Sequence, residues 1–273
     1  AYMVSPGNHE SECHSPVCVV DPFLGRSLMN FTAYNHRWHM PSASSSGRAN
    51  MWYSFNVGPV HFVSLNTETD FPGAEEATTG DGHFKWLKAG HFGAEGEYLR
   101  WLEADLKAAR ASGKKWIIAG GHRPLMRLHH SGMIELLEKY EVDLYFAGHA
   151  HRYWRDPPSA DVNNTQKFYK DPKGYIQIVS GGAGCDEMAF KLAPQCPAGG
   201  QGSCVPSEHL PDDDPEKTSQ VNPAYATDVL SMGRLNVNVS TLHFELVDSA
   251  HGQLLDEVVV TKTARASLTQ YLV

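Results

Sequence analysis

The sequence predicts an α/β fold, because apolar runs of strand length alternate with segments of helical period. The clearest helical segment is residues 98–111, and the clearest strand-like runs are residues 115–119 and 142–147. Both runs are largely apolar, which is typical of strands that are covered on both faces. Each run ends at a glycine that is closely followed by histidine. We therefore expect a sheet whose central strands are parallel and are connected through helices.

The first third of the chain predicts short strands separated by loops. Residues 2–5 form a short run that we interpret as a strand, whereas residues 11–48 are polar and lack periodicity, which predicts a long loop. Residues 51–57 and 60–66 flank Gly58-Pro59 and alternate large with small or polar side chains. Two such runs around a turn predict an antiparallel pair. Residues 70–96 are rich in glycine and charge, and predict another loop.

The middle of the chain predicts a strand–helix–strand crossover. The helix at residues 98–111 has a leucine stripe, acidic residues near its start, basic residues near its end and Gly113 beyond it. A second helix is predicted for residues 133–140, between the strands 115–119 and 142–147. Because such crossovers are almost always right-handed, these two strands should be parallel and share a carboxyl edge.

The remaining chain predicts one further strand, two irregular segments and a final group of strands. No repeat or linker divides the sequence, so we expect residues 1–273 to form one partial domain that ends in a strand meander at residues 225–262. The glycines at 181–184 lack the Lys-Ser/Thr of a phosphate-binding loop, and we interpret them as tight turns. The predicted segments are irregular 152–173, strand 174–180, loop 189–224, and strands 235–239, 241–247 and 254–260.

Side chains of the types that commonly bind metals follow three of the predicted strands. They are Asn8, His122, His149 and His151. In open α/β sheets ligands bind at the carboxyl ends of the strands, so we expect these side chains along one edge. In extended backbone His149 and His151 would point the same way. With 15 histidines in the chain, one such pair arises easily by chance, but its repetition at three strand ends is specific.

Composition excludes two classes of partner. The formal net charge is −8 and the pI is about 6.0, without a dense cluster of lysine and arginine, so we expect no nucleic acid to bind. No apolar run approaches the roughly 20 residues of a transmembrane helix, so we expect no membrane insertion.

Cysteine and asparagine usage indicates a secreted or vacuolar protein. Five cysteines occur without any C-x-x-C pair, and we expect disulfides between Cys13 and Cys18 and between Cys196 and Cys204, which leaves Cys185 without a partner in this sequence. Three N-glycosylation acceptor sequences favour the same compartments. Their asparagines are Asn30, Asn163 and Asn238.

The ligand-bearing motifs resemble those of a known family. Gly-Asn-His-Glu at 7–10, a strand ending in His122 and Gly-His-Ala-His at 148–151 are similar, in order and spacing, to the last three of the five metal-binding motifs of the purple acid phosphatases. The resemblance also includes residues 52–62 and residues 233–235, so it covers most of the chain. It implies a four-layer αββα metallophosphoesterase sandwich, here lacking its N-terminal part. The family's first two motifs, Asp-x-Gly and Gly-Asp-x-x-Tyr, belong upstream of Gly7, which only six residues precede.

The resemblance also implies roles for individual residues. Asn8, His122 and His149 would hold a divalent zinc, iron or manganese ion, and His151 would hold Fe(III). The family's aspartate and tyrosine ligands have no counterpart in this sequence. His9 matches a histidine that contacts the phosphate and helps to protonate the leaving group, although packing behind the ligands is an alternative. His129 and His130 resemble a histidine pair of the plant members, in a loop two residues shorter, which attracts phosphate and acts as general acid.

The implied activity is that of an acid phosphatase, which hydrolyses small phosphate monoesters with a hydroxide on a ferric–divalent metal pair. A phytase or a phosphodiesterase on the same site is an alternative, as is a non-catalytic fragment that binds metal or phosphate. Because this chain carries only part of the implied site, we expect it to be inactive by itself and to bind at most one divalent ion. The sequence leaves the oligomeric state open.

Overall fold

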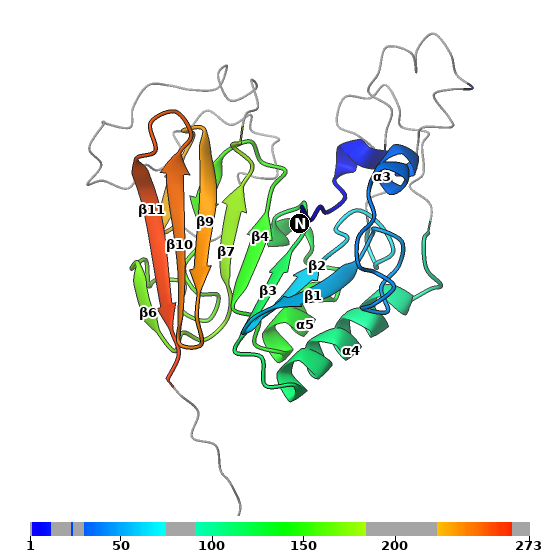
Figure 1. Ribbon diagram of the computed structural model, residues 1–273, viewed down its shortest axis with the longest axis horizontal. Coiled ribbons are helices and arrows are strands. Elements are labelled where there is room, and N and C mark those ends of the chain that lie inside the picture. Colours follow the sequence, from blue (N-terminus) through cyan, green and yellow to red (C-terminus); the bar gives the residue numbers. More distant parts are fainter. Residues whose placement is uncertain (1, 12–22, 24–29, 75–90, 184–222, 264–273) are drawn as a thin grey trace, which may run out of the picture.

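Two β-sheets face each other in the computed structural model, and helices cover the outer face of the larger sheet (Figure 1). The structure describes residues 2–11, 23, 30–74, 91–183 and 223–263. The larger sheet has seven strands in the order β1-β2-β3-β4-β7-β5-β8. Their bounds are β1 Tyr53–Val57, β2 Val60–Ser64, β3 Trp116–Gly120, β4 Leu144–Ala147, β5 Tyr153–Arg155, β7 Ile176–Ser180 and β8 Tyr225–Thr227.

The four central strands of the larger sheet, β2, β3, β4 and β7, are parallel. Ile118 of β3 is paired with Leu144 of β4, so both strands end at the same edge of the sheet. The predicted crossover is therefore confirmed. The antiparallel pairing of β1 with β2 is confirmed too, with Tyr53 opposite Ser64.

Helices α4 (Glu97–Ala111) and α5 (Met133–Lys139) form the outer layer on the larger sheet (Figure 1). Each begins after a glycine in the left-handed region, Gly96 with φ 68° and Gly132 with φ 79°. In the leucine stripe of α4, Leu102 and Leu106 are buried in the core and Leu99 is partly buried against it, as the spacing predicts. Among the described residues, no helix combines the length and apolarity needed to span a membrane.

The smaller sheet packs on the inner face of the larger one and has the order β6-β11-β10-β9. Its strands are β6 Phe168–Lys170, β9 Ser231–Val237, β10 Thr241–Asp248 and β11 Leu254–Thr261. Alternate side chains of β10 and β11 are buried, and Phe244 and Val258 meet Ile118 and Ile178 in a second core between the sheets. The predicted α/β sandwich is thus confirmed. The described residues form three layers, and a helical fourth layer is not among them.

Four expectations about local structure are corrected or lie outside the described part. Residues 2–5 are not a strand, because the carbonyl oxygen of Val4 accepts hydrogen bonds from side chains, Tyr53 Oη at 2.7 Å and Tyr34 Oη at 3.2 Å. The loop predicted at 11–48 contains helix α3 (Thr32–Arg37), and the segment predicted as irregular at 152–173 contains β5 and β6. All five cysteines, and hence both predicted disulfides, lie outside the described residues.

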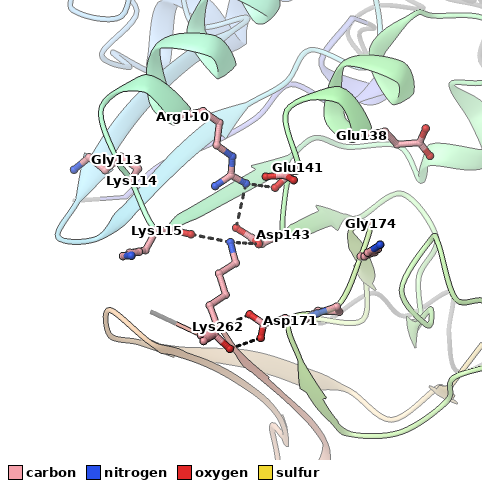
Figure 2. Close-up of a pocket in the computed structure, with 13 residues that line it drawn as sticks. Arg110, Gly113, Lys114, Lys115, Glu138, Glu141, Asp143, Asp171, Gly174 and Lys262 are labelled. Carbon is pink, nitrogen blue, oxygen red and sulfur yellow. Dashed lines mark hydrogen bonds and ion pairs between the residues drawn. The ribbon is translucent and has the colours of Figure 1, made fainter. Parts of the chain in front are cut away.

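A charged cavity of about 860 Å³ lies at the amino-terminal edge of the parallel strands (Figure 2). Asp143, just before β4, is its centre. The Asp143 carboxylate accepts a hydrogen bond from the Ile117 amide at 2.9 Å and pairs with Lys262 Nζ at 2.5 Å and with the Arg110 guanidinium at 3.7 Å. Lys262 follows β11 and Arg110 belongs to α4, so this carboxylate connects all three layers. Three of the charged side chains that line the cavity, those of Arg110, Asp143 and Lys262, therefore pair with one another.

A buried carboxylate next to β5 predicts a pH-dependent stability. Asp156 is 9% exposed, and burial raises its pKa from 3.8 to about 6. The folded state therefore keeps the Asp156 carboxyl protonated to a higher pH than the unfolded state does. As the pH rises from about 4 to 6, ionisation of Asp156 progressively destabilises the folded state, and above about pH 6 this effect is fully present. Asp156→Asn keeps an oxygen that can accept the Gln177 Nε2 hydrogen bond. We expect it to stabilise the protein by up to about 3 kcal/mol at pH 7 and much less at pH 4.

Urea unfolding of the wild type and Asp156→Asn at both pH values checks this prediction, with the exposed Asp161→Asn as the matched control. Equal changes in the free energy of unfolding at pH 4 and pH 7 would show that ionisation of Asp156 is not the cause.

Candidate metal centre

Three of the predicted ligands meet at the carboxyl edge of the larger sheet. Nε2 of His122 lies 2.7 Å from Oδ1 of Asn8 and 3.1 Å from Nδ1 of His149. The two imidazole rings are 4.9 Å apart, centre to centre, and meet edge to face at 73°. Asn8 precedes His122 by 114 residues, and His149 follows it by 27. The fold thus brings one amide oxygen and two ring nitrogens together from three distant segments.

Backbone hydrogen bonds hold the two histidine loops side by side. The Gly121 amide donates to the carbonyl of Phe146 at 3.0 Å, and the Gly148 amide donates to the carbonyl of His122 at 2.9 Å. These bonds continue the pairing of β3 with β4 past the ends of both strands. The positions of His122 and His149 are therefore set by the sheet itself.

The turn that carries His149 differs from the predicted geometry. His149, and not Gly148, has a positive φ of 64°, and the Ala150 amide donates back to the carbonyl of Gly148 at 2.7 Å. The backbone is thus folded back and is not extended, so the predicted reason for His149 and His151 to share a side is wrong. A non-glycine residue in this region costs about 1–2 kcal/mol, and such strain is concentrated at functional sites.

Asn8 reaches the histidines from the short 3₁₀ helix η1 (Asn8–Ser11). The preceding Gly7 lies so close to the site that a Cβ atom there would be 2.9 Å from Nδ1 of His122 and 2.9 Å from Oε2 of Glu10. The Gly7 amide also donates to that Glu10 oxygen, at 2.8 Å. A residue without a side chain at position 7 is therefore needed for this approach.

Both histidines of the group are held in the neutral form. Burial, followed by the charges of His149 and Arg123, lowers the pKa of His122 to about 3. Burial, followed by Arg123 and Arg127, lowers the pKa of His149 to about 4. A neutral imidazole keeps a ring nitrogen with a free electron pair, which is the form that binds metal ions. An amide oxygen and two imidazole nitrogens that converge in this way suit a divalent ion such as zinc.

Of the other predicted site residues, His9 and His151 act on the charge of this group, whereas His129 and His130 have no contact with it among those described. His9 is exposed next to Asn8, and His151 is half-buried; the charges of both lower the pKa of His122 and of His149. His129 and His130 are exposed in the loop that follows the 3₁₀ helix η2 (Leu125–Arg127). The described contacts do not bring these two histidines to the group.

Within the described part of the chain, no three histidine, cysteine, aspartate or glutamate side chains form a metal-holding cluster. The group at the sheet edge contains only two such residues, together with the amide of Asn8.

One set of residues at the site was not predicted from the sequence. Thr67 and Glu68 follow β2 and are buried against the His122 loop, where Glu68 pairs with Arg123 at 2.9 Å. The sequence feature that could have identified them is the strand predicted at residues 60–66, because a strand parallel to β3 must also end at this edge.

Comparison with known proteins gives one family match and several relatives. The model of the calcineurin-like phosphoesterase family matches residues 1–153. An acid phosphatase of Aspergillus ficuum is 32% identical over 242 residues, which cover 67% of this chain and 39% of that protein. Acid phosphatase type 7 of Mus musculus is 31% identical over 216 residues, 68% of this chain and 41% of that protein.

Among solved structures, a purple acid phosphatase from yellow lupin (Lupinus luteus) seeds superposes with a TM-score of 0.61 at 20% sequence identity. The superposition covers 97% of this chain and 41% of the lupin chain, and shows that the two share a fold. The chain thus spans about two fifths of the length of these relatives.

Proposed function

Because the chain belongs to the calcineurin-like phosphoesterase family, we propose that it forms part of an acid phosphatase that hydrolyses phosphate monoesters. The observation that carries this proposal is the convergence of Asn8, His122 and His149 at the carboxyl edge of the sheet. Two relatives named acid phosphatases, each matching about two thirds of this chain, support the same reaction.

Asn8, His122 and His149 would hold a divalent zinc, iron or manganese ion, and His151 would belong to a neighbouring Fe(III) site. Metal ions bound there would supply Lewis acidity toward a phosphoryl oxygen and lower the pKa of water. The protein's own contribution is to keep His122 and His149 neutral. Their pKa values of about 3 and 4 leave both imidazoles unprotonated at pH 5, where an ordinary histidine is charged.

His9, His129 and His130 would act on the substrate and not on the metal. All three are exposed, and His9 adjoins Asn8 in the chain. When protonated, an exposed imidazole attracts a phosphate group and can act as general acid for the leaving group.

Turnover of three substrates by the full-length protein tests the proposed reaction. We expect p-nitrophenyl phosphate to be hydrolysed fastest and below pH 7, bis-p-nitrophenyl phosphate more slowly, and phytate no faster than the simple monoester. A preference for the diester would indicate a phosphodiesterase, and a preference for phytate would indicate a phytase. Metal binding without any turnover would contradict the catalytic proposal.

We also place the protein in a secreted or vacuolar compartment. Asn30, Asn163 and Asn238 are all exposed, as glycan acceptors must be. If treatment of the natural protein with peptide N-glycosidase leaves its mass unchanged, this placement loses its support.

A further inference from the structure

The loop that follows β2 is polar in sequence and yet buried. Asn66, Thr67, Glu68 and Thr69 are between 0% and 6% exposed. Buried polar side chains in folded proteins are almost always hydrogen-bonded, so the partners of these four side chains indicate what they do. We infer that Thr67, held by Glu68, is a positioning residue that fixes the His122 loop for metal binding; the link to metal rests on the proposed function.

The Thr67 hydroxyl binds two consecutive backbone amides at the end of β3. Its Oγ1 accepts hydrogen bonds from the amides of His122 at 3.1 Å and Arg123 at 3.0 Å. The same hydroxyl donates to Oε1 of Glu68 at 3.0 Å. One hydroxyl thereby uses both its acceptor capacity and its proton at the point where the chain turns from the strand into the site.

Glu68 and Arg123 close this network into a ring. Nε of Arg123 lies 3.1 Å and 2.9 Å from the two carboxylate oxygens of Glu68, whose side chain is only 4% exposed. The Glu68 amide in turn donates to Oδ1 of Asn66 at 3.0 Å. A buried, charged pair of this kind keeps its geometry, because breaking it would leave an uncompensated charge. The ring therefore anchors Thr67 and holds the cation of Arg123 next to the two histidines.

Close packing leaves the Thr67 loop little freedom to shift. A Cβ atom at Gly121 would lie 2.5 Å from the Thr67 methyl group, and the Leu65 amide donates to the carbonyl of Gly120 at 2.7 Å. The β2–β3 pairing thus continues past the strand ends, just as the β3–β4 pairing does. His122 is consequently held from both sides, by the amide of Gly148 just after β4 and by the Thr67 hydroxyl after β2.

Two substitutions at one position separate positioning from packing. Thr67→Val keeps the shape of the side chain and removes the hydroxyl, whereas Thr67→Ser keeps the hydroxyl. Thr261→Val is the matched control, because the Thr261 hydroxyl also forms a hydrogen bond with the backbone, donating to the carbonyl of Tyr169 at 3.3 Å, but in the smaller sheet. Each variant is measured without metal, by amide hydrogen exchange, and with zinc, by calorimetric titration.

In the metal-free chain we expect Thr67→Val to speed exchange of the His122 and Arg123 amides about tenfold, with Thr67→Ser and Thr261→Val near wild type. We expect Thr67→Val alone to weaken zinc binding about 10- to 100-fold, as loss of an outer-shell partner typically does. Unchanged exchange at both amides, or a similar loss of zinc affinity in the Thr261→Val control, would overturn the inference. If wild type bound no zinc, the proposed function would fail, while the exchange data would still decide whether Thr67 positions the loop.

Discussion

Replacing His122 by alanine is expected to weaken zinc binding more than about 100-fold and to reduce phosphatase turnover of the full-length protein to background. His122 is the central member of the group, because its Nε2 is within hydrogen-bonding distance of both Asn8 and His149. Loss of an outer-shell partner alone typically costs 10- to 100-fold in metal affinity, so loss of a ligand should cost more.

The matched control for this substitution is His243→Ala. His243 is a partly exposed histidine of β10 that pairs with Glu257 at 3.2 Å in the smaller sheet. We expect this variant to keep wild-type zinc affinity and turnover. Zinc titration and p-nitrophenyl phosphate assays on both variants check the prediction, with circular dichroism to confirm that each is folded. Wild-type zinc affinity in the His122→Ala variant would show that His122 is not a metal ligand.

The second large effect is expected for Arg155→Met, which should lower the free energy of unfolding by about 3–5 kcal/mol. Arg155 and Asp256 are 1% and 0% exposed, and their side chains are joined by two hydrogen bonds, of 2.8 Å and 3.2 Å. Tyr153 also donates to the Asp256 carboxylate at 2.9 Å. The pair connects β5 of the larger sheet to β11 of the smaller one. Removing the cation leaves a buried carboxylate without its counter-charge.

A double variant shows whether the loss of stability comes from the lost attraction between the two charges or from the Asp256 carboxylate that is left buried without a counter-charge. Arg155→Met with Asp256→Leu removes both charges, and we expect it to recover most of the stability, since apolar replacements of a buried pair are often neutral. Lys139→Met, which breaks an exposed pair with Glu103, should stay near wild type. Urea unfolding measures all three variants. A double variant as unstable as the single one would show that the stranded charge is not the cause.

Sequence patterns predicted the parts of the fold that depend on long apolar runs. The strands β3 and β4 and the helix α4 follow from runs and stripes that only a covered sheet and an amphipathic helix satisfy. The three-residue strands β5 and β6 were missed, because so short a segment carries no period. Residues 2–5 have a strand-like composition, but the carbonyl of Val4 bonds to tyrosine side chains and not to a neighbouring strand.

The candidate site was predictable where ligands follow strands directly. His122 and His149 converge because the parallel strands β3 and β4 end at one edge, whereas Asn8 reaches them from the 3₁₀ helix η1, which follows no strand. The folded-back turn at His149 could not be predicted, since glycine and not histidine is the expected residue at positive φ. Thr67 was missed for another reason. Polar residues after a strand usually indicate an exposed loop, and only the tertiary structure shows that this one is buried.

The central claim is that Asn8, His122 and His149 together bind a divalent metal ion. Anomalous diffraction on both sides of the zinc absorption edge, from crystals of the chain grown with zinc, tests it most directly. We predict an anomalous difference peak among the Asn8, His122 and His149 side chains, and its absence in crystals of His122→Ala. A well-occupied zinc ion elsewhere, for example between His243 and Glu257, with no peak at the edge of the larger sheet, would contradict the claim.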